Sequence, residues 1–198
     1  MKSAYSLDNE LVRISLSGKL PRLLLHCCCA PCASYVLECL SSVFSITLLF
    51  YNPNIQSREE YDKREAELEK LLNEAGYKGK VKQLACDYDN AAFSSAAGPF
   101  WDEPEGGKRC EACFTLRLGE AAKRAKEGGF DYFATTLSVS PHKDASRLNE
   151  IGTAMAEEYE VKYLSADFKK RDGYKRSVEL SKQYGLYRQS YCGCIVTN

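Results

Sequence analysis

The cysteines are the residues of this 198-residue chain with the most chemistry to offer. The chain contains ten, and all but Cys39 and Cys86 fall into three short segments. These segments are His26-Cys27-Cys28-Cys29-Ala30-Pro31-Cys32, Cys110-Glu111-Ala112-Cys113 and Cys192-Gly193-Cys194. Thiols spaced this closely are typical of metal sites, iron–sulfur sites and redox pairs rather than of packing.

Each segment has its own possible use. Cys110 and Cys113 stand at the start of an expected helix, whose dipole favours thiolate. Adjacent side chains point in different directions, so only two or three of the first segment's thiols can share an ion. Cys29 and Cys32 alone also fit a thioredoxin-type redox pair, and Cys32 fits the core equally well. The tail pair would be ordered by a bound metal.

The number of clustered thiols exceeds the four that one structural zinc needs. Together the three segments therefore indicate an iron–sulfur cluster or a site with more than one metal.

The composition limits the other possibilities. The length fits one domain over residues 1–198, with a core that needs no disulfides. The formal net charge is zero, which leaves only local patches for binding nucleic acid. No apolar run has the length of a membrane span, and residues 1–20 carry charges throughout, unlike a signal peptide. We expect a cytoplasmic protein with no membrane partner, in which thiols stay reduced.

Apolar runs alternate with amphipathic segments along the chain. Strands are expected at 23–25, 44–51, 80–85, 130–136 and 161–164, and helices at 33–40, 57–76, 113–127, 144–159 and 172–184. Residues 87–109 are expected to be irregular. The alternation predicts an α/β fold with a parallel sheet flanked by helices on both faces.

Sites in such folds lie beyond the carboxyl ends of the strands. The first cysteine segment, Asn52-Pro53-Asn54 and residues 135–143 each follow an expected strand. Thiols occupy the first strand-to-helix turn, where nucleotide-binding relatives carry a glycine-rich loop. A nucleotide phosphate is therefore not expected there.

Several other residues are candidates for the site. His26 is a possible ligand or acid, although a hydrogen-bonded structural role is more common for such a residue. Asp89 follows the third strand and could supply a carboxylate, or could serve as a turn residue. Lys169, Lys170 and Arg171 could follow an RNA backbone, or form a solvated helix start. Arg188 and Gln189 could read a base edge or hold the tail.

Several motifs together resemble the QueH-type epoxyqueuosine reductases, over residues 26–194. They are the first cysteine segment, Tyr51-Asn52-Pro53-Asn54-Ile55, Tyr61-x-x-Arg64-Glu65, Tyr88-Asp89, Gly107-Lys108-Arg109-Cys110-x-x-Cys113-Phe114-x-x-Arg117-Leu118, Thr135-Thr136-Leu137-x-x-Ser140-Pro141-x-Lys143 and Leu186-Tyr187-Arg188-Gln189-x-Tyr191-Cys192-Gly193-Cys194.

The resemblance implies reduction of epoxyqueuosine at the tRNA wobble position to queuosine. It also implies an adenine-nucleotide alpha-hydrolase-like (HUP-type) fold and an iron–sulfur cluster, of the 4Fe–4S kind, with an adjacent iron ion and no cobalamin. The partners would be tRNA and an unidentified electron donor.

Residue roles follow from this resemblance as expectations. Cys27, Cys28, Cys110 and Cys113 are the expected cluster ligands, and Cys29, Cys192, Cys194 and Asp89 the expected ligands of the second metal. The spacing leaves this division open. Lys143, Arg188, Gln189, Lys169, Lys170 and Arg171 are expected to contact tRNA, and Asp89 and His26 are the candidate catalytic residues.

Two other functions fit parts of the sequence. One is a thiol–disulfide oxidoreductase that uses Cys29 and Cys32 and holds no iron. The other is a zinc-stabilised RNA-binding module without catalysis. Analysis of metal and acid-labile sulfide distinguishes the three.

Overall fold

A five-stranded parallel sheet organises the chain, in the strand order β3-β2-β1-β4-β5. The computed structural model describes residues 7–194. The strands are β1 Arg22–His26, β2 Ser45–Leu49, β3 Lys82–Leu84, β4 Tyr132–Thr135 and β5 Lys162–Tyr163. The α-helices are α1 Leu7–Leu16, α2 Ala30–Leu40, α3 Arg58–Glu74, α4 Asn90–Ala97, α5 Lys108–Glu127, α6 Ala145–Glu158 and α7 Gly173–Gln183, and Gly98–Phe100 and Leu137–Val139 form 3-10 turns. The predicted α/β fold is confirmed.

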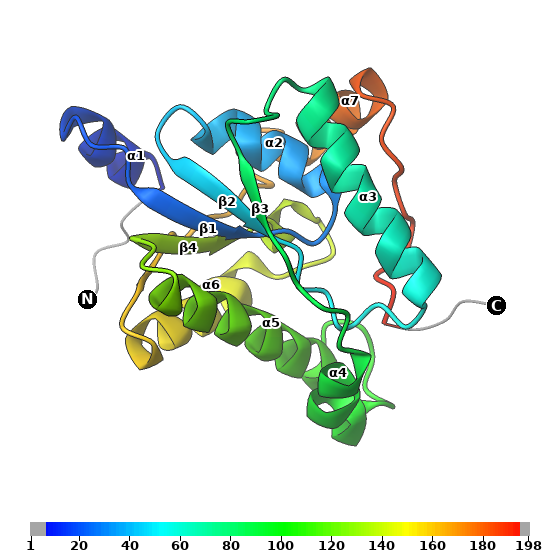
Figure 1. The fold of residues 1–198 in the computed structure, drawn as a ribbon. Helices are drawn as coiled ribbons and strands as arrows, with labels where there is room; N and C mark the ends of the chain where they lie inside the picture. The colour runs from blue at the N-terminus through cyan, green and yellow to red at the C-terminus, as the bar shows by residue number, and fades with distance from the viewer. Residues whose placement is uncertain (1–6, 195–198) are drawn as a thin grey trace.

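Helices cover both faces of the sheet (Figure 1). Leu23 and Leu25 of β1 belong to the core that contains residues of α2 and α3, whereas Leu24 packs in the core beside α5. This alternation follows from the two-residue period of a strand, which sends successive side chains to opposite faces. The more specific HUP-type assignment stays a prediction.

The start of each helix depends on local chemistry. The helix expected over 57–76 begins after Ser57, whose hydroxyl accepts a hydrogen bond from the Glu60 backbone amide and so caps α3. Helix α2 begins directly after Cys29, and α5 begins at Lys108, before both Cys110 and Cys113. Both Cys-x-x-Cys motifs therefore lie at helix starts.

The prediction that residues 87–109 are irregular was wrong. Helix α4 occupies Asn90–Ala97 in this segment, followed by the 3-10 turn. The Asp89 side chain accepts a hydrogen bond from the Ala92 amide and so caps α4, while Phe93 and Ala97 are buried against α5 residues. The alanine-rich sequence Asn90-Ala91-Ala92-Phe93 supports a helix once its apolar side is buried.

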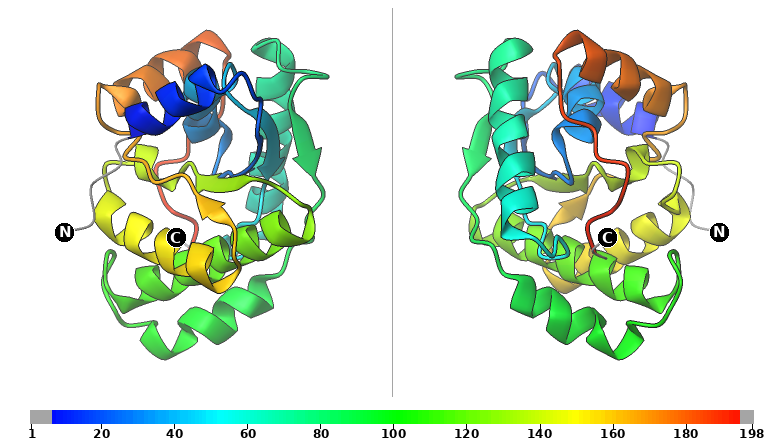
Figure 2. Two further views of the ribbon diagram at one scale, coloured as in Figure 1. Left: turned by 90° about the vertical axis from the view of Figure 1, so that its left-hand side faces the viewer. Right: turned by 90° about the vertical axis from the view of Figure 1, so that its right-hand side faces the viewer.

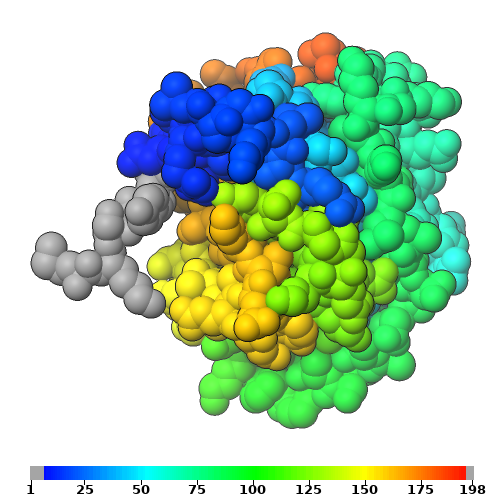
Figure 3. All heavy atoms as spheres, turned by 60° about the vertical axis from the view of Figure 1, so that its left-hand side comes forward, coloured from blue at the N-terminus to red at the C-terminus, as the bar shows by residue number. Residues whose placement is uncertain are grey.

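The C-terminal segment crosses the carboxyl ends of the strands (Figure 2, right). It runs beside α3, where the Gln56 amide donates to the Gly193 carbonyl at 3.0 Å. At the opposite end of the sheet, α1 lies against residues around β4 and β5 (Figure 3). Arg13 of α1 donates to the Tyr132 hydroxyl, and this hydroxyl donates to Glu10. In residues 7–194, no helix combines the length and apolarity that crossing a bilayer requires.

Two helical glycines give a matched test of this packing. A Cβ at Gly152 of α6 would lie 2.5 Å from Cε1 of Tyr163, whereas a Cβ at Gly119 of α5 would meet only the flexible Met155 Sδ, at 3.3 Å. Gly152→Ala should lower the free energy of unfolding by about 1–3 kcal/mol through overpacking. Gly119→Ala should leave it unchanged or raise it by up to about 1 kcal/mol. Urea denaturation measures both, and a Gly152→Ala protein as stable as the parent would contradict the packing.

Candidate metal centre

A cavity of about 450 Å³ lies beyond the carboxyl ends of the central strands. Residues that follow β1, β2 and β4 all line it, and the C-terminal segment closes one side. The structure thus brings together the first cysteine segment, Asn52 and Asn54, residues 137–143 and Cys192. This is the edge of the sheet at which the sequence predicted a site.

Cys28, Cys29 and Cys32 form a first thiol group. Their Sγ atoms all lie within 4.8 Å of one another, and those of Cys28 and Cys29 are 3.8 Å apart. Cys29 is the N-cap residue of α2, and Cys32 lies in the first turn of this helix. The helix dipole therefore favours negative charge on the group.

A second thiol group comprises Cys110, Cys113, Cys192 and Cys194. Cys113 and Cys194 are buried in one cluster with Phe93 and Ala97, and Cys192 packs against it. Cys110 lies one helical turn before Cys113, and its sulfur accepts a hydrogen bond from the Gly106 amide at 3.3 Å. Residues from the middle of the chain and from its C-terminal segment therefore supply sulfur to one region.

Arg117 of α5 lies between the two groups. It is 2% exposed, and its Nη1 is 3.9 Å from the Cys113 sulfur. Its other hydrogen-bond partners are Asn52 Oδ1 and His26 Nε2. Across residues 7–194, no carboxylate forms an ion pair with this guanidinium, so its charge acts on the thiols.

One thiol of each group has a lowered pKa. Hydrogen bonds from Cys29 and Cys32, with the charge of Arg117 and the Thr136 hydroxyl, hold the pKa of Cys28 well below its usual value. A hydrogen bond from Cys194, with the charges of Lys143 and Arg117, lowers the pKa of Cys192 to about 5. The donating thiols carry the opposite shift, and the pKa of Cys29 rises to about 12. In each group the neighbouring thiols and positive charges thus favour the deprotonated form of one cysteine.

His26 occupies a structural position rather than the cavity wall. Its ring is fully buried, with Nδ1 2.9 Å from the Thr135 hydroxyl and Nε2 3.0 Å from the Tyr51 carbonyl. Burial and the charge of Arg117 lower its pKa to about 3. The ring is therefore neutral at physiological pH and connects the end of β4 to the segment that follows β2.

Cys27 and Asp89 lie outside the cavity. Cys27 is fully buried, its thiol points to the Leu25 carbonyl, and it packs in the core on the α2 side of the sheet. Burial raises its pKa well above the usual value. Asp89 is exposed and caps α4. Neither side chain lines the cavity, and neither belongs to the close group of Cys28, Cys29 and Cys32.

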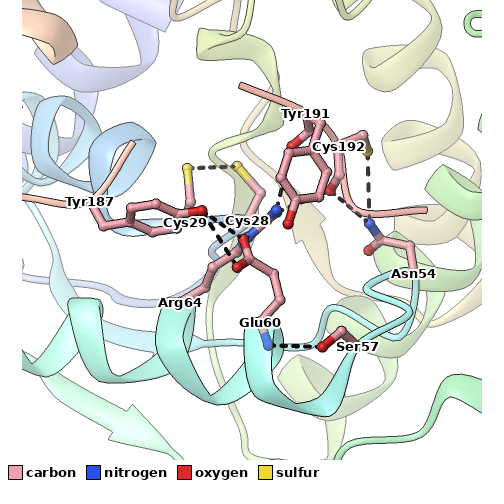
Figure 4. Close-up of polar contacts among 9 residues, drawn as sticks. All are labelled: Cys28, Cys29, Asn54, Ser57, Glu60, Arg64, Tyr187, Tyr191 and Cys192. Atoms are coloured by element: carbon pink, nitrogen blue, oxygen red, sulfur yellow. Dashed lines mark hydrogen bonds and ion pairs between the residues drawn. The ribbon is translucent and has the colours of Figure 1, made fainter. Parts of the chain in front are cut away.

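The C-terminal segment is fastened to α3 mainly by Arg64 (Figure 4). This guanidinium is 3% exposed, pairs with Glu60 at 2.7 Å and donates to the Cys192 carbonyl at 3.0 Å. The Tyr187 hydroxyl contacts the same carboxylate at 3.3 Å. Asn54 directs its amide nitrogen at the Cys192 carbonyl and sulfur. These contacts position Cys192 over the cavity.

The expected tRNA contacts divide into two sets. Lys143, Arg188 and Gln189 line the cavity. Lys169, Lys170 and Arg171 do not line it. Lys169 pairs with Asp167 at 3.2 Å and Arg171 pairs with Asp8, which partly neutralises that patch.

Comparison with known proteins shows the family of this chain. A family model described as epoxyqueuosine reductase QueH matches residues 23–198. The chain belongs to this family. A relative from Streptococcus pyogenes serotype M1 is 43% identical, over 88% of this chain and 69% of its own length. A relative from Staphylococcus epidermidis is 43% identical, over 90% and 76%, and one from Thermotoga maritima is 35% identical, over 87% and 88%. All three are named epoxyqueuosine reductase QueH.

Three residues of this QueH family member line the site although they are not among the ligands and contacts that the resemblance implied. Cys32 joins Cys28 and Cys29, and the Cys-x-x-Cys spacing across a helix start was the available signal. Arg117 interrupts the apolar side of α5 four residues after Cys113. Asn54 lines the cavity, and its buried Oδ1 has no hydrogen-bond partner in the described part of the chain.

Replacing Arg64 tests how the tail is held. Arg64→Gln should free the segment around Cys192, because hydrogen bonds from a charged donor contribute about 1.5–3 kcal/mol. In metal-free protein under anaerobic conditions, we expect alkylation of Cys192 by iodoacetamide to accelerate by about tenfold or more, measured by mass spectrometry.

Arg58→Gln on the same helix is the control, since Arg58 is exposed and pairs only with Asp62 among charged side chains of the described chain. Circular dichroism verifies that both variants are folded. Equal alkylation rates in the Arg64→Gln and parent proteins would rule out this positioning role.

Proposed function

We propose that this chain reduces epoxyqueuosine to queuosine at the wobble position of tRNA. The observation that carries the proposal is that the first thiol group and Cys192 of the second line one cavity together with the buried Arg117, whose guanidinium also reaches the Cys113 sulfur. Membership in the QueH family supports it, since the relatives are named for this reduction. A tRNA substrate also agrees with the expectation that the protein is located in the cytoplasm.

The reaction defines what the site must supply. Both carbon–oxygen bonds of the epoxide break, and the two carbons become an alkene. The oxygen leaves as water, so the balance requires two electrons and two protons. When bound, an iron–sulfur cluster and an adjacent iron ion would supply electrons one at a time and Lewis acidity toward the oxygen. No side chain described here can supply the electrons catalytically, so an external donor is needed, and cobalamin is not part of the proposal.

The first thiol group suits a single ion. Two thiolates on one tetrahedral ion, with metal–sulfur distances of about 2.3 Å, lie about 3.8 Å apart. The sulfurs of Cys28 and Cys29 have this separation, and Cys32 adds a third possible ligand. We therefore propose that Cys28, Cys29 and Cys32 hold the iron ion.

The second thiol group would then hold the iron–sulfur cluster. Cys110, Cys113, Cys192 and Cys194 number as many thiols as a 4Fe–4S cluster takes. Apolar residues such as Phe93 and Ala97 surround them, which would keep water from the cluster. This division moves Cys28 from the expected cluster ligands to the ion, and moves Cys192 and Cys194 in the other direction.

The buried charge of Arg117 fits an anionic centre. An uncompensated buried cation costs several kcal/mol, by an order-of-magnitude estimate. Thiolate ligands on either side would balance this cation, whereas neutral thiols would not. Lys143, half-buried in the cavity wall, adds positive charge beside Cys192 and Cys28.

The remaining part of the cavity would bind the modified nucleoside. The cavity volume of about 450 Å³ is within the range of roughly 300–1,000 Å³ for small-molecule sites. Because the anticodon loop is unpaired, the base can enter flipped out of its stack.

Iron and acid-labile sulfide analysis tests the proposal. The anaerobically reconstituted parent should hold about five irons and about four sulfides per chain, as one 4Fe–4S cluster and one ion require, and should convert epoxyqueuosine in tRNA to queuosine. Cys32→Ser should lose about one iron and keep its sulfide. Cys113→Ser should lose most iron and sulfide, and both variants should lose activity.

Cys86→Ser is the matched control, because Cys86 is a half-buried thiol outside both groups. Colourless protein with about one zinc would indicate the RNA-binding alternative. Protein without metal but with a titratable disulfide between Cys29 and Cys32 would indicate the thiol oxidoreductase. Iron-replete protein that leaves epoxyqueuosine unchanged in the presence of a reductant would refute the activity.

A further inference from the structure

Tyr174 is an exposed aromatic residue at the wall of the cavity. It is the second residue of α7, its side chain lines the cavity, and it remains 42% exposed. Burying an aromatic ring is strongly favourable, so a ring left open beside a binding site is suited to contact a ligand. The thiol chemistry does not require this residue.

Arg188 from the C-terminal segment is held next to this ring. Its Cζ lies 5.6 Å from the ring centroid. Its Nη1 donates to the Ser177 carbonyl at 3.3 Å and to the Ser181 hydroxyl at 3.1 Å. In residues 7–194 no carboxylate pairs with Arg188, so its charge remains available to an anion.

The backbone before Tyr174 is closely constrained. Arg171 and Asp172 have φ values of 55° and 59°, a conformation that side chains other than glycine adopt at a cost. A Cβ at Gly173 would clash with the Phe168 carbonyl and lie 2.5 Å from Cε1 of Tyr35. The backbone that carries Tyr174 is therefore fixed by the packing beneath it rather than lying in a free loop.

We propose that Tyr174 and Arg188 form a stacking platform for the nucleotide next to the modified one in the anticodon loop. This inference rests on the proposed tRNA substrate. Aromatic rings and guanidinium planes stack on the bases of single-stranded RNA, and the Arg188 charge is suited to the adjacent phosphate. The epoxide-bearing nucleoside would occupy the cavity while its neighbour remains at the rim.

The platform replaces the basic patch as the main RNA contact. Phe168 is 3% exposed and cannot stack on a base, and Lys169 and Arg171 already pair with carboxylates. Nothing at this rim distinguishes it, as a surface for a protein partner, from the other exposed apolar residues of the described chain. The combination of an open ring, a fixed guanidinium and an adjoining nucleoside-sized cavity favours RNA.

Binding to a synthetic anticodon stem-loop that carries epoxyqueuosine tests the platform in reconstituted protein. Two further probes replace the nucleotide on either side of the modified one with an abasic residue. Tyr174→Ala should weaken binding to the intact RNA by about 5- to 100-fold, the range that one base stack contributes. It should have little further effect on one of the abasic probes, because the stacked base is already missing.

Tyr174→Phe should retain the parent affinity, since the ring is kept. Trp101→Ala is the control, because Trp101 is 44% exposed but does not line the cavity. Arg188→Gln should make the slope of log affinity against log salt concentration shallower by about one, the amount that one phosphate contact contributes.

The outcomes separate this inference from the function on which it rests. If the parent reduces the modified stem-loop but Tyr174→Ala binds every probe as the parent does, the platform is wrong and the reductase activity stands. Equal losses with the intact and both abasic probes would also overturn it. If the parent does not reduce the modified stem-loop, the proposed function fails on its own readout.

Discussion

A buried positive charge without a carboxylate partner is the constraint around which the site is arranged. In the described chain, Arg117 is enclosed by the Cys113 sulfur, Asn52 and His26, with Cys28 and Cys192 near enough to feel its charge. Neutral thiols would leave that charge unbalanced inside the protein. Thiolates on both sides would balance it, and deprotonated sulfur is the form that binds iron. The arginine therefore links the fold to the metal chemistry that we propose.

The same arrangement joins distant parts of the chain. Helix α2 presents one thiol group and α5 presents Cys110 and Cys113, while the C-terminal segment brings Cys192 and Cys194 across the strand ends. Arg64 holds this segment through a backbone carbonyl, which positions a ligand without occupying its sulfur. Binding of metal should accordingly stabilise the fold, because the bound state orders three separate segments at once.

Much of this could be predicted from sequence because it follows from local rules. The period of apolar residues gave the strands and helices, and the position of each motif after a strand gave the common edge. What could not be predicted depends on neighbours in space. Alternation along extended backbone sends Cys27 to the core and Cys28 to the cavity. The spacing of the cysteines does not reveal which of the two faces the cavity. Spacing shows neither the helix that Asp89 caps nor, in the described chain, the absence of a carboxylate beside Arg117, because both depend on neighbours in space.

The central claim is that iron binds at two thiol groups on either side of Arg117. Anomalous X-ray diffraction at the iron absorption edge, from crystals of the anaerobically reconstituted protein, tests this most directly. The account predicts one strong peak at Cys110, Cys113, Cys192 and Cys194 and a weaker peak at Cys28, Cys29 and Cys32. A catalytically active crystal without iron at either group, or with iron bound elsewhere, would contradict it.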